Sequence, residues 1–199
     1  MKGPLFYSKI LLFGEYGIIE DSKGLSIPYN FFNGALKFSK AETKDSKKSN
    51  KILIQFHKYL SGIHDLNLDL NKFENELKEG IYFDSSIPQG YGVGSSGAIV
   101  AAVYDKYAKS KIKISENLNR NKLVDLRNIF SKMESFFHGK SSGLDPLNSY
   151  LSIPILIESK NKIDVTGIPI EKVNGEGAIF LLDSGQMGST ATMVEIFMK

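Results

Sequence analysis

The chain has 199 residues, of which 42% are hydrophobic and 24% charged, with 25 Lys and Arg against 22 Asp and Glu. This composition excludes a wholly disordered chain, and the lack of cysteine excludes a disulfide scaffold, a thiolate zinc site and a cysteine nucleophile. A formal net charge of +3 is too small to indicate nucleic-acid binding. Lys9 divides the N-terminal apolar run, which argues against a signal peptide, and no segment has the ~18 apolar residues of a membrane span. We therefore expect a single folding unit in the cytoplasm.

Apolar spacing and glycine positions predict the elements in chain order. They are a strand over 5–13, a turn at 14–17 with a second strand from 18, a strand over 33–39, a solvated loop over 40–51, a helix over 52–63, a strand over 81–87, helices over 98–108 and 123–137, and strands over 150–158 and 177–183. This order favours an α+β fold over a regularly alternating α/β sheet. The lysine-rich stretch 40–51 is interpreted as solvated, because it lacks the interleaved aromatics of an RNA-binding arm.

Glycine and serine are concentrated in residues 88–98, PQGYGVGSSGA, directly before a predicted helix. Glycines allow the backbone to approach a ligand closely and to adopt positive φ. The start of the following helix presents free N–H groups and a positive dipole end, which suit a phosphate. Ser95 and Ser96 add hydroxyls for phosphate or magnesium. Because a capped turn needs fewer glycines, the segment predicts a phosphate-binding loop.

Three better-known glycine loops fit this segment poorly. No G-x-x-x-x-G-K-[ST] occurs, which excludes a P-loop. The spacing of Gly92, Gly94 and Gly97 matches a dinucleotide fingerprint, but the polar residues 84–86 stand where its hydrophobic strand should be. Protein kinases are excluded because no V-A-I-K, H-R-D or D-F-G motif follows.

Two further signals are ambiguous when taken alone. Asp145 precedes Pro146, a pattern that forms ordinary turns and also holds catalytic carboxylates. The nearby G-x-S-x-G at 139–143 resembles a serine-hydrolase elbow, but a helix precedes it instead of a strand. Lys9 lies inside an apolar strand, where its charge must either reach solvent at an exposed edge or pair with a carboxylate.

Together these segments resemble the GHMP kinase superfamily (galactokinase, homoserine kinase, mevalonate kinase and phosphomevalonate kinase), and mevalonate kinases most of all. The matching segments are SKILLFGEY at 8–16, the glycine loop at 88–98 and ESFFHGKSSGLDPLN at 134–148, with a weaker likeness at 183–192. The resemblance implies an N-terminal domain of the ribosomal protein S5 domain 2-like fold over 1–185. It also implies that 186–199 begin the link to a C-terminal ferredoxin-like domain, whose glycine motif does not appear after Asp145.

The same resemblance implies a role for each matching residue. Asp145 is the catalytic base and Lys9 its partner, Ser96 and Glu134 bind Mg²⁺, and Glu15 and Tyr16 contact the substrate. The residues implied to bind ATP are Pro88, Gly90, Gly92, Val93, Gly94, Ser95, Ser96, Gly97 and Ala98. The implied reaction transfers the γ-phosphoryl group of ATP to a primary alcohol, mevalonate before others, which gives 5-phosphomevalonate.

Several alternatives remain open at this point. Mevalonate kinases usually carry histidine where this chain has Tyr16, and tyrosine is closer to phosphomevalonate kinases. From another class, the chain could be an inactive nucleotide-binding module. Without a second domain we expect weak or absent turnover, and self-association or a homodimer through the exposed surface. We expect neither nucleic acid nor membrane as a partner.

Overall fold

The computed structural model describes residues 4–15, 17–39, 41, 43–113, 119–159, 162–167, 182–183, 185 and 196–198. Its elements are β1 (Phe6–Phe13), the 3₁₀ turn η1 (Gly17–Glu20), β2 (Gly24–Phe38), α1 (Lys44–Ser61), α2 (Leu70–Lys78), β3 (Ile81–Ser85), α3 (Ser95–Tyr107), α4 (Arg120–His138), α5 (Leu144–Leu151), β4 (Ile155–Ser159) and β5 (Lys162–Val165). The chain combines an antiparallel sheet with helices that do not alternate regularly with its strands, which confirms the predicted α+β class.

The described strands form one antiparallel sheet around the long strand β2. β1 pairs with β2 along nearly its whole length, and β3 and β4 pair with the two ends of β2. β5 extends the sheet beyond β4. This arrangement places β1 directly beneath the helices, where its central residues are buried.

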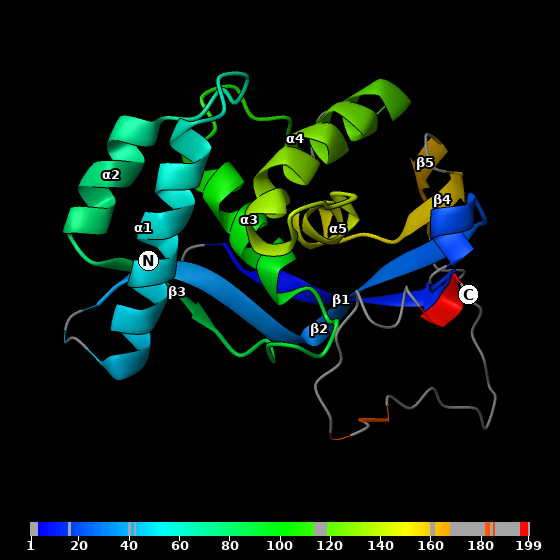
Figure 1. Cartoon of the computed structure of the whole chain (residues 1–199), viewed down its shortest axis with the longest axis horizontal. Helices are drawn as coiled ribbons and strands as arrows, with labels where there is room; N and C mark the ends of the chain where they lie inside the picture. The colour runs from blue at the N-terminus through cyan, green and yellow to red at the C-terminus, as the bar shows by residue number, and fades with distance from the viewer. Residues whose placement is uncertain are drawn as a thin grey trace.

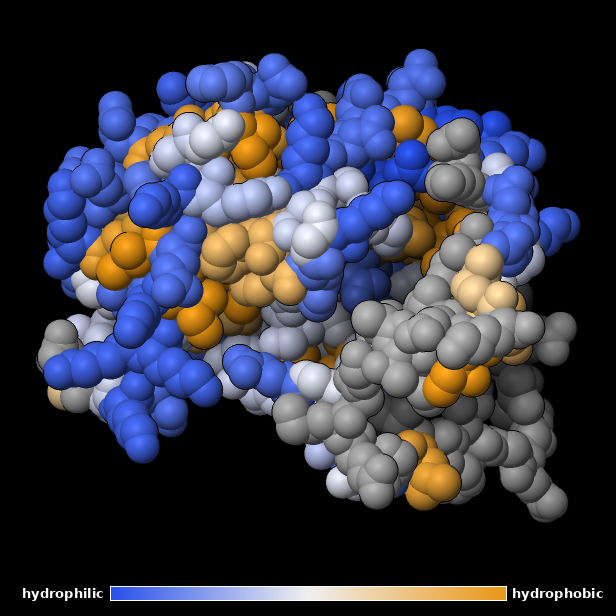
Figure 2. All heavy atoms as spheres, viewed as in Figure 1, coloured by the Kyte–Doolittle hydropathy of each residue, from blue (hydrophilic) through white to orange (hydrophobic). Residues whose placement is uncertain are grey.

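The helices cover one face of the sheet (Figure 1). α3 is the central helix and contacts α4, α5, β1 and β2. Its apolar residues are buried all round, as expected for a helix enclosed by other elements. The outer surface of the helical layer is mostly hydrophilic, with hydrophobic patches between the polar side chains (Figure 2). Within the described residues, no helix is both long and apolar enough to cross a bilayer.

Buried serines hold β1 in place where its pairing with β2 is irregular. Tyr7 faces Asn33 but Ser8 faces Tyr29, so β2 carries extra residues at this point. The Ser8 hydroxyl donates to the Tyr29 carbonyl at 2.7 Å, and Ser149 of α5 donates to the Tyr7 carbonyl. Ser8 and Ser149 are themselves buried, so these hydrogen bonds satisfy their hydroxyls and fasten β1 to β2 and to α5. The next residue along β1 is Lys9.

Helices α3, α4 and α5 approach each other closely at glycines. A Cβ on Gly97 would lie 2.7 Å from the carbonyl carbon of Asp145. A Cβ on Gly143, whose φ is +74°, would lie 2.2 Å from the carbonyl oxygen of Arg127. Glycine is therefore required at both positions, and it brings the first turn of α5 against the first turn of α3.

The structure corrects several predicted elements in the first half of the chain. Residues 17–20 form a 3₁₀ turn instead of a strand, and the next strand runs over 24–38, well beyond the predicted 33–39. Residues 44–51 are the first turns of α1 instead of a loop. The hydroxyl of Thr43 accepts from the Ser46 backbone while the Ser46 hydroxyl accepts from the Thr43 backbone, so a capping box starts this polar helix.

Other corrections fall later in the chain. α2 was not predicted, and residues 150–151 end α5 instead of starting a strand, which begins at Ile155. Asp145 lies in the first turn of α5 instead of an isolated turn. The helices predicted at 98–108 and 123–137 are confirmed as α3 and α4, which begin earlier, at Ser95 and Arg120. The predicted strand at 177–183 falls largely outside the described residues.

Gly143→Ala should destabilise the fold far more than Gly139→Ala. Both glycines have positive φ, so each alanine incurs roughly 1–2 kcal/mol of backbone strain. Only at Gly143 does the new methyl meet backbone atoms, because nothing lies within 4 Å of a Cβ at Gly139. Steric overlap should add at least about 2 kcal/mol at Gly143. Urea unfolding of the two variants measures this difference, and equal losses would show that α4 and α5 do not meet as described.

Candidate active site

Residues from four elements converge where β1 passes under the first turns of α3 and α5. Lys9 comes from β1, Ser96 from α3, Glu134 from α4 and Asp145 from α5. They are joined by two sets of contacts, an ion pair between Lys9 and Asp145 and a hydrogen-bonded cluster around Glu134. The structure thus brings together four residues that the sequence analysis had singled out from distant segments.

Lys9 and Asp145 form a largely buried ion pair. Lys9 Nζ lies 3.0 Å from Asp145 Oδ1, and the two side chains are 10% and 35% exposed. Burial lowers the pKa of Lys9, but attraction to Asp145 and the hydrogen bond between them, helped by Glu15 and Glu134, outweigh it and leave the pKa above its ordinary value. Lys9 is therefore a permanent cation, and the described part of the chain offers no hydrogen-bond partner to Asp145 Oδ2.

Glu134 is a buried carboxyl group held by two serines. Its side chain is almost inaccessible, and it accepts a hydrogen bond from Ser96 at 3.1 Å on Oε1 and another from Ser141 on Oε2. Burial first, and then repulsion from Asp145, raise the pKa of Glu134 to about 7, although both serines and Lys9 oppose the shift. No cation within the described residues forms an ion pair with it. Its charge is thus poorly compensated by the protein alone.

The glycine loop is built as the sequence predicted. Gly90, Gly92 and Gly94 have φ values of +81°, +69° and +83°, which favour glycine strongly. The Lys9 backbone N–H donates to the Val93 carbonyl at 3.0 Å, which fixes the loop against β1. A Cβ on Gly94 would lie 3.0 Å from Lys9 Cγ, so the loop crosses directly over the lysine side chain.

The loop leads into the N-terminus of α3. Gly94 is the N-cap, and no side chain among the described residues caps the helix. The first amides of α3, at Ser95, Ser96 and Gly97, are therefore donors for which a helix has no internal acceptor. Gly97 and Ala98 are buried in the packed helix, and the Ala98 amide donates to the Gly94 carbonyl at 3.0 Å, so it is not one of these open donors.

The other predicted residues lie around this centre. Pro88 is half-buried at the start of the loop, and Glu15 is exposed just after β1. Glu15 is close enough to favour the charge on Lys9. Tyr16 lies outside the described residues.

Two polar residues of the site received no role from the sequence. The Ser141 hydroxyl donates to Glu134 and accepts from the Gly143 amide at 3.0 Å, so it connects the carboxylate to the turn before Asp145. His138 Nε2 lies 2.9 Å from the Ser96 hydroxyl. The only signal for either was its place in the HGKSSGLDP block, since both contacts depend on how α4 meets α3 and the following turn.

Mg²⁺ fits the donors that this cluster offers. The Glu134 carboxylate and the Ser96 hydroxyl are hard oxygen donors side by side, and a poorly compensated buried carboxylate favours a cation. The described residues contain no group of three or more His, Cys, Asp or Glu suited to a metal. A site with one carboxylate is nevertheless typical of Mg²⁺ bound together with a nucleotide, whose phosphates and waters complete the shell.

Part of the sequence matches a known protein family. Residues 56–152 match the family described as GHMP kinases N terminal domain. The match includes the glycine loop, Glu134 and Asp145. About half of the chain thus matches a GHMP kinase N-terminal domain, and the structure has the α+β fold predicted from its sequence. No protein among the curated sequences matches this chain.

Solved structures similar to this chain include three mevalonate kinases. The L. major enzyme in complex with R-mevalonate is 16% identical with a TM-score of 0.48, and the match covers 84% of this chain and 55% of that one. The enzyme from methicillin-resistant Staphylococcus aureus MRSA252 is 18% identical with a TM-score of 0.43, covering 81% and 53%. The Methanococcus jannaschii enzyme is 18% identical with a TM-score of 0.45, covering 88% and 57%. The chain thus spans little more than half the length of these proteins.

The two halves of the ion pair should differ in their cost to stability. Asp145→Ala leaves the Lys9 cation buried without its partner, which should cost about 3 kcal/mol of unfolding free energy. Lys9→Met keeps the aliphatic stem and leaves Asp145, which is more exposed and better hydrated, so the loss should be smaller by at least about 1 kcal/mol. Denaturant unfolding at neutral pH compares them, and a greater loss for Lys9→Met would contradict the burial described here.

Glu134 should make the metal-free fold less stable as pH rises. Its pKa is about 7 in the folded chain against an ordinary value of 4.5, so the folded state holds the proton more tightly than the unfolded state. Relative to Glu134→Gln, the wild-type free energy of unfolding should fall by about 3 kcal/mol between pH 4.5 and pH 7 and then level off. Unfolding curves across this range, without divalent cations, test it. A difference that is constant with pH would mean that Glu134 is not buried in the way described.

Proposed function

We propose that this domain binds Mg²⁺·ATP at the glycine loop and transfers the γ-phosphoryl group to a small primary alcohol. The observation that carries the proposal is the ion pair between Lys9 and Asp145 beneath the amides that start α3. A phosphate on those amides would lie next to a carboxylate with a free oxygen. Phosphoryl transfer depends mainly on such positioning and on neutralised charge, because it asks little covalent chemistry of the protein.

Asp145 is the residue proposed to accept the proton of the attacking hydroxyl. Its Oδ1 is held by Lys9, which leaves Oδ2 for the substrate. The side chain is still partly exposed, so an alcohol could reach it from solvent. Gly97 supports this arrangement, since only glycine lets α3 approach the backbone of Asp145 so closely. The base and the phosphate-binding amides are thereby held on adjacent helix starts.

Lys9 is proposed to balance negative charge at the reacting groups. As a permanent cation it pairs with the Asp145 carboxylate, and it would stabilise the negative charge that develops on the attacking oxygen. The loop crosses the lysine stem at Gly94, so the cation lies beside the phosphate-binding amides as well. One cation can therefore serve the base and the transferred group in turn.

Ser96 and Glu134 are the residues proposed to hold Mg²⁺. When bound, the cation would neutralise phosphate charge and orient the nucleotide. Ser141 positions the carboxylate for this task from its second oxygen. The raised pKa of Glu134 fits a group whose charge is meant to be balanced by a ligand and not by the protein.

Mevalonate is the acceptor we propose first. The support is the likeness of the segments at 8–16, 88–98 and 134–148 to mevalonate kinases. Phosphomevalonate and other small alcohols are the competing acceptors, because Tyr16 follows Glu15 where mevalonate kinases usually have histidine.

The test is phosphoryl transfer from ATP to mevalonate and phosphomevalonate with Mg²⁺, alongside binding of a fluorescent ATP analogue. Asp145→Asn keeps the size of the side chain and an acceptor for Lys9 but loses the base. It should lower kcat by about 10²–10⁴-fold while leaving nucleotide affinity nearly unchanged. Because the chain spans about half of the similar kinases, the assay is run on this chain and on one extended with a partner domain.

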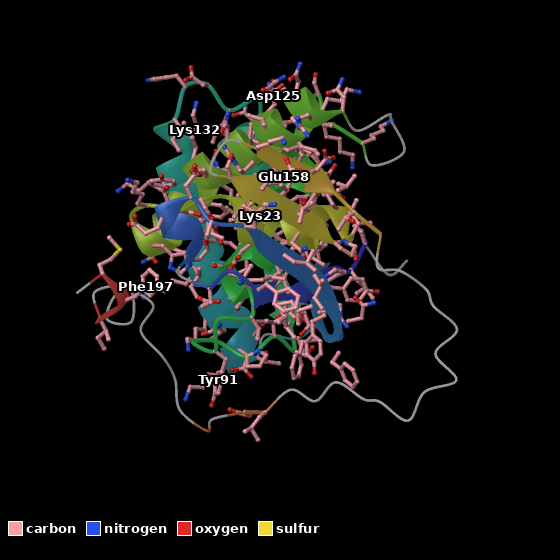
Figure 3. The ribbon with its side chains drawn as sticks, turned by 90° about the vertical axis from the view of Figure 1, so that its right-hand side faces the viewer. Lys23, Tyr91, Asp125, Lys132, Glu158 and Phe197 are labelled. Carbon is pink, nitrogen blue, oxygen red and sulfur yellow. The ribbon has the colours of Figure 1, made fainter. Side chains whose placement is uncertain are left out.

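Asp125→Asn is the matched control. Asp125 is exposed on α4 at the opposite end of the molecule from Tyr91 of the glycine loop (Figure 3), so the change should leave turnover and binding unaltered. Nucleotide binding without transfer in either form, indifferent to Asp145→Asn, would instead identify an inactive nucleotide-binding module. Failure to bind nucleotide at all would overturn the proposal.

A further inference from the structure

His138 contacts one of the proposed metal ligands and has no role in the reaction described above. It is the last residue of α4, one turn beyond Glu134, so both side chains lie on the same face of that helix. Its Nε2 lies 2.9 Å from the Ser96 hydroxyl, and its ring stands beside Phe137 with centroids 6.4 Å apart. The remainder of the residue is exposed, so its polar contact is directed inward to Ser96.

The Ser96 hydroxyl is engaged on two sides at once. It donates its one proton to Glu134 Oε1 at 3.1 Å. A hydroxyl oxygen has two lone pairs, so it can accept from the N–H of His138 on one and keep the other for a cation. Glu134 and His138 together therefore fix the rotation of the hydroxyl about its Cβ–Oγ bond. Without His138 the hydroxyl would be held only by its 3.1 Å bond to Glu134, so its rotation would be less firmly set.

We infer that His138 is a positioning residue for the magnesium site, acting through Ser96. The inference rests on the proposed function, since it concerns the same cation. Hydrogen bonds to a metal ligand from a neighbouring side chain commonly change metal affinity by about 10–100-fold, because they orient the ligand before the metal binds. His138 would contribute in this way without touching the metal, the nucleotide or the acceptor.

The experiment measures Mn²⁺ binding by electron paramagnetic resonance, with Mn²⁺ in place of Mg²⁺ and a non-hydrolysable ATP analogue present. His138→Phe keeps an aromatic ring beside Phe137 but removes the ring nitrogens, and should weaken Mn²⁺ binding about 10-fold. His138→Gln places an amide N–H near the position of Nε2 and should restore binding to within about 3-fold of wild type. His64→Phe, exposed between α1 and α2, is the control and should change nothing.

Two further measurements separate this role from a structural one and from the proposed function. Urea unfolding of His138→Phe without metal should match wild type, because the residue is exposed. Ser96→Ala and Glu134→Gln should both abolish tight Mn²⁺ binding. If they do and His138→Phe binds Mn²⁺ like wild type, only the inference about His138 is wrong. A Gln variant as weak as the Phe variant would also overturn it. If neither Ser96→Ala nor Glu134→Gln weakens binding, or wild type binds no Mn²⁺ with the analogue, the metal site and this inference fall together.

Discussion

The rest of the site depends on the buried ion pair between Lys9 and Asp145. A lysine in the interior of a strand is costly unless a carboxylate meets it, and here the carboxylate comes from a helix far along the chain. The pair therefore fixes the start of α5 over β1. The proposed chemistry depends on it as well, because the pair keeps one carboxylate oxygen in place and leaves the second available.

Glycine makes this convergence sterically possible. Gly94 lets the loop cross Lys9, Gly97 lets α3 meet the backbone of Asp145, and Gly143 lets the turn before α5 press against α4. A side chain at any of them would push apart the elements that carry Asp145, the first amides of α3 and Glu134. The glycines thus allow close packing of the helices around the loop, and in the proposed function they also open the backbone to phosphate.

Local sequence patterns predicted the glycine loop and the unusual position of Lys9, but they missed two helix segments and several side-chain contacts of the site. The glycine loop before α3 and the charge of Lys9 in an apolar strand are visible in the sequence itself, and likeness to a family connected them with Glu134 and Asp145. The start of α1 was missed because its first turns are almost entirely polar, and only the Thr43 capping box reveals them. α2 was missed because its buried residues are few, Phe73 and Leu77. The contact of His138 with Ser96 joins distant segments, and the contacts of Ser141 depend on how the turn after α4 folds back on that helix, so neither follows from a local pattern.

The central claim is that the amides at the start of α3, the Ser96–Glu134 pair and Asp145 form one site. Its most direct test is a crystal structure of this chain with Mg²⁺ and a non-hydrolysable ATP analogue. The account predicts that the triphosphate lies on the amides of Ser95 to Gly97, with the cation on Ser96 and Glu134 and the γ-phosphate facing Asp145. A nucleotide bound elsewhere, or a cation that contacts neither Ser96 nor Glu134, would contradict it.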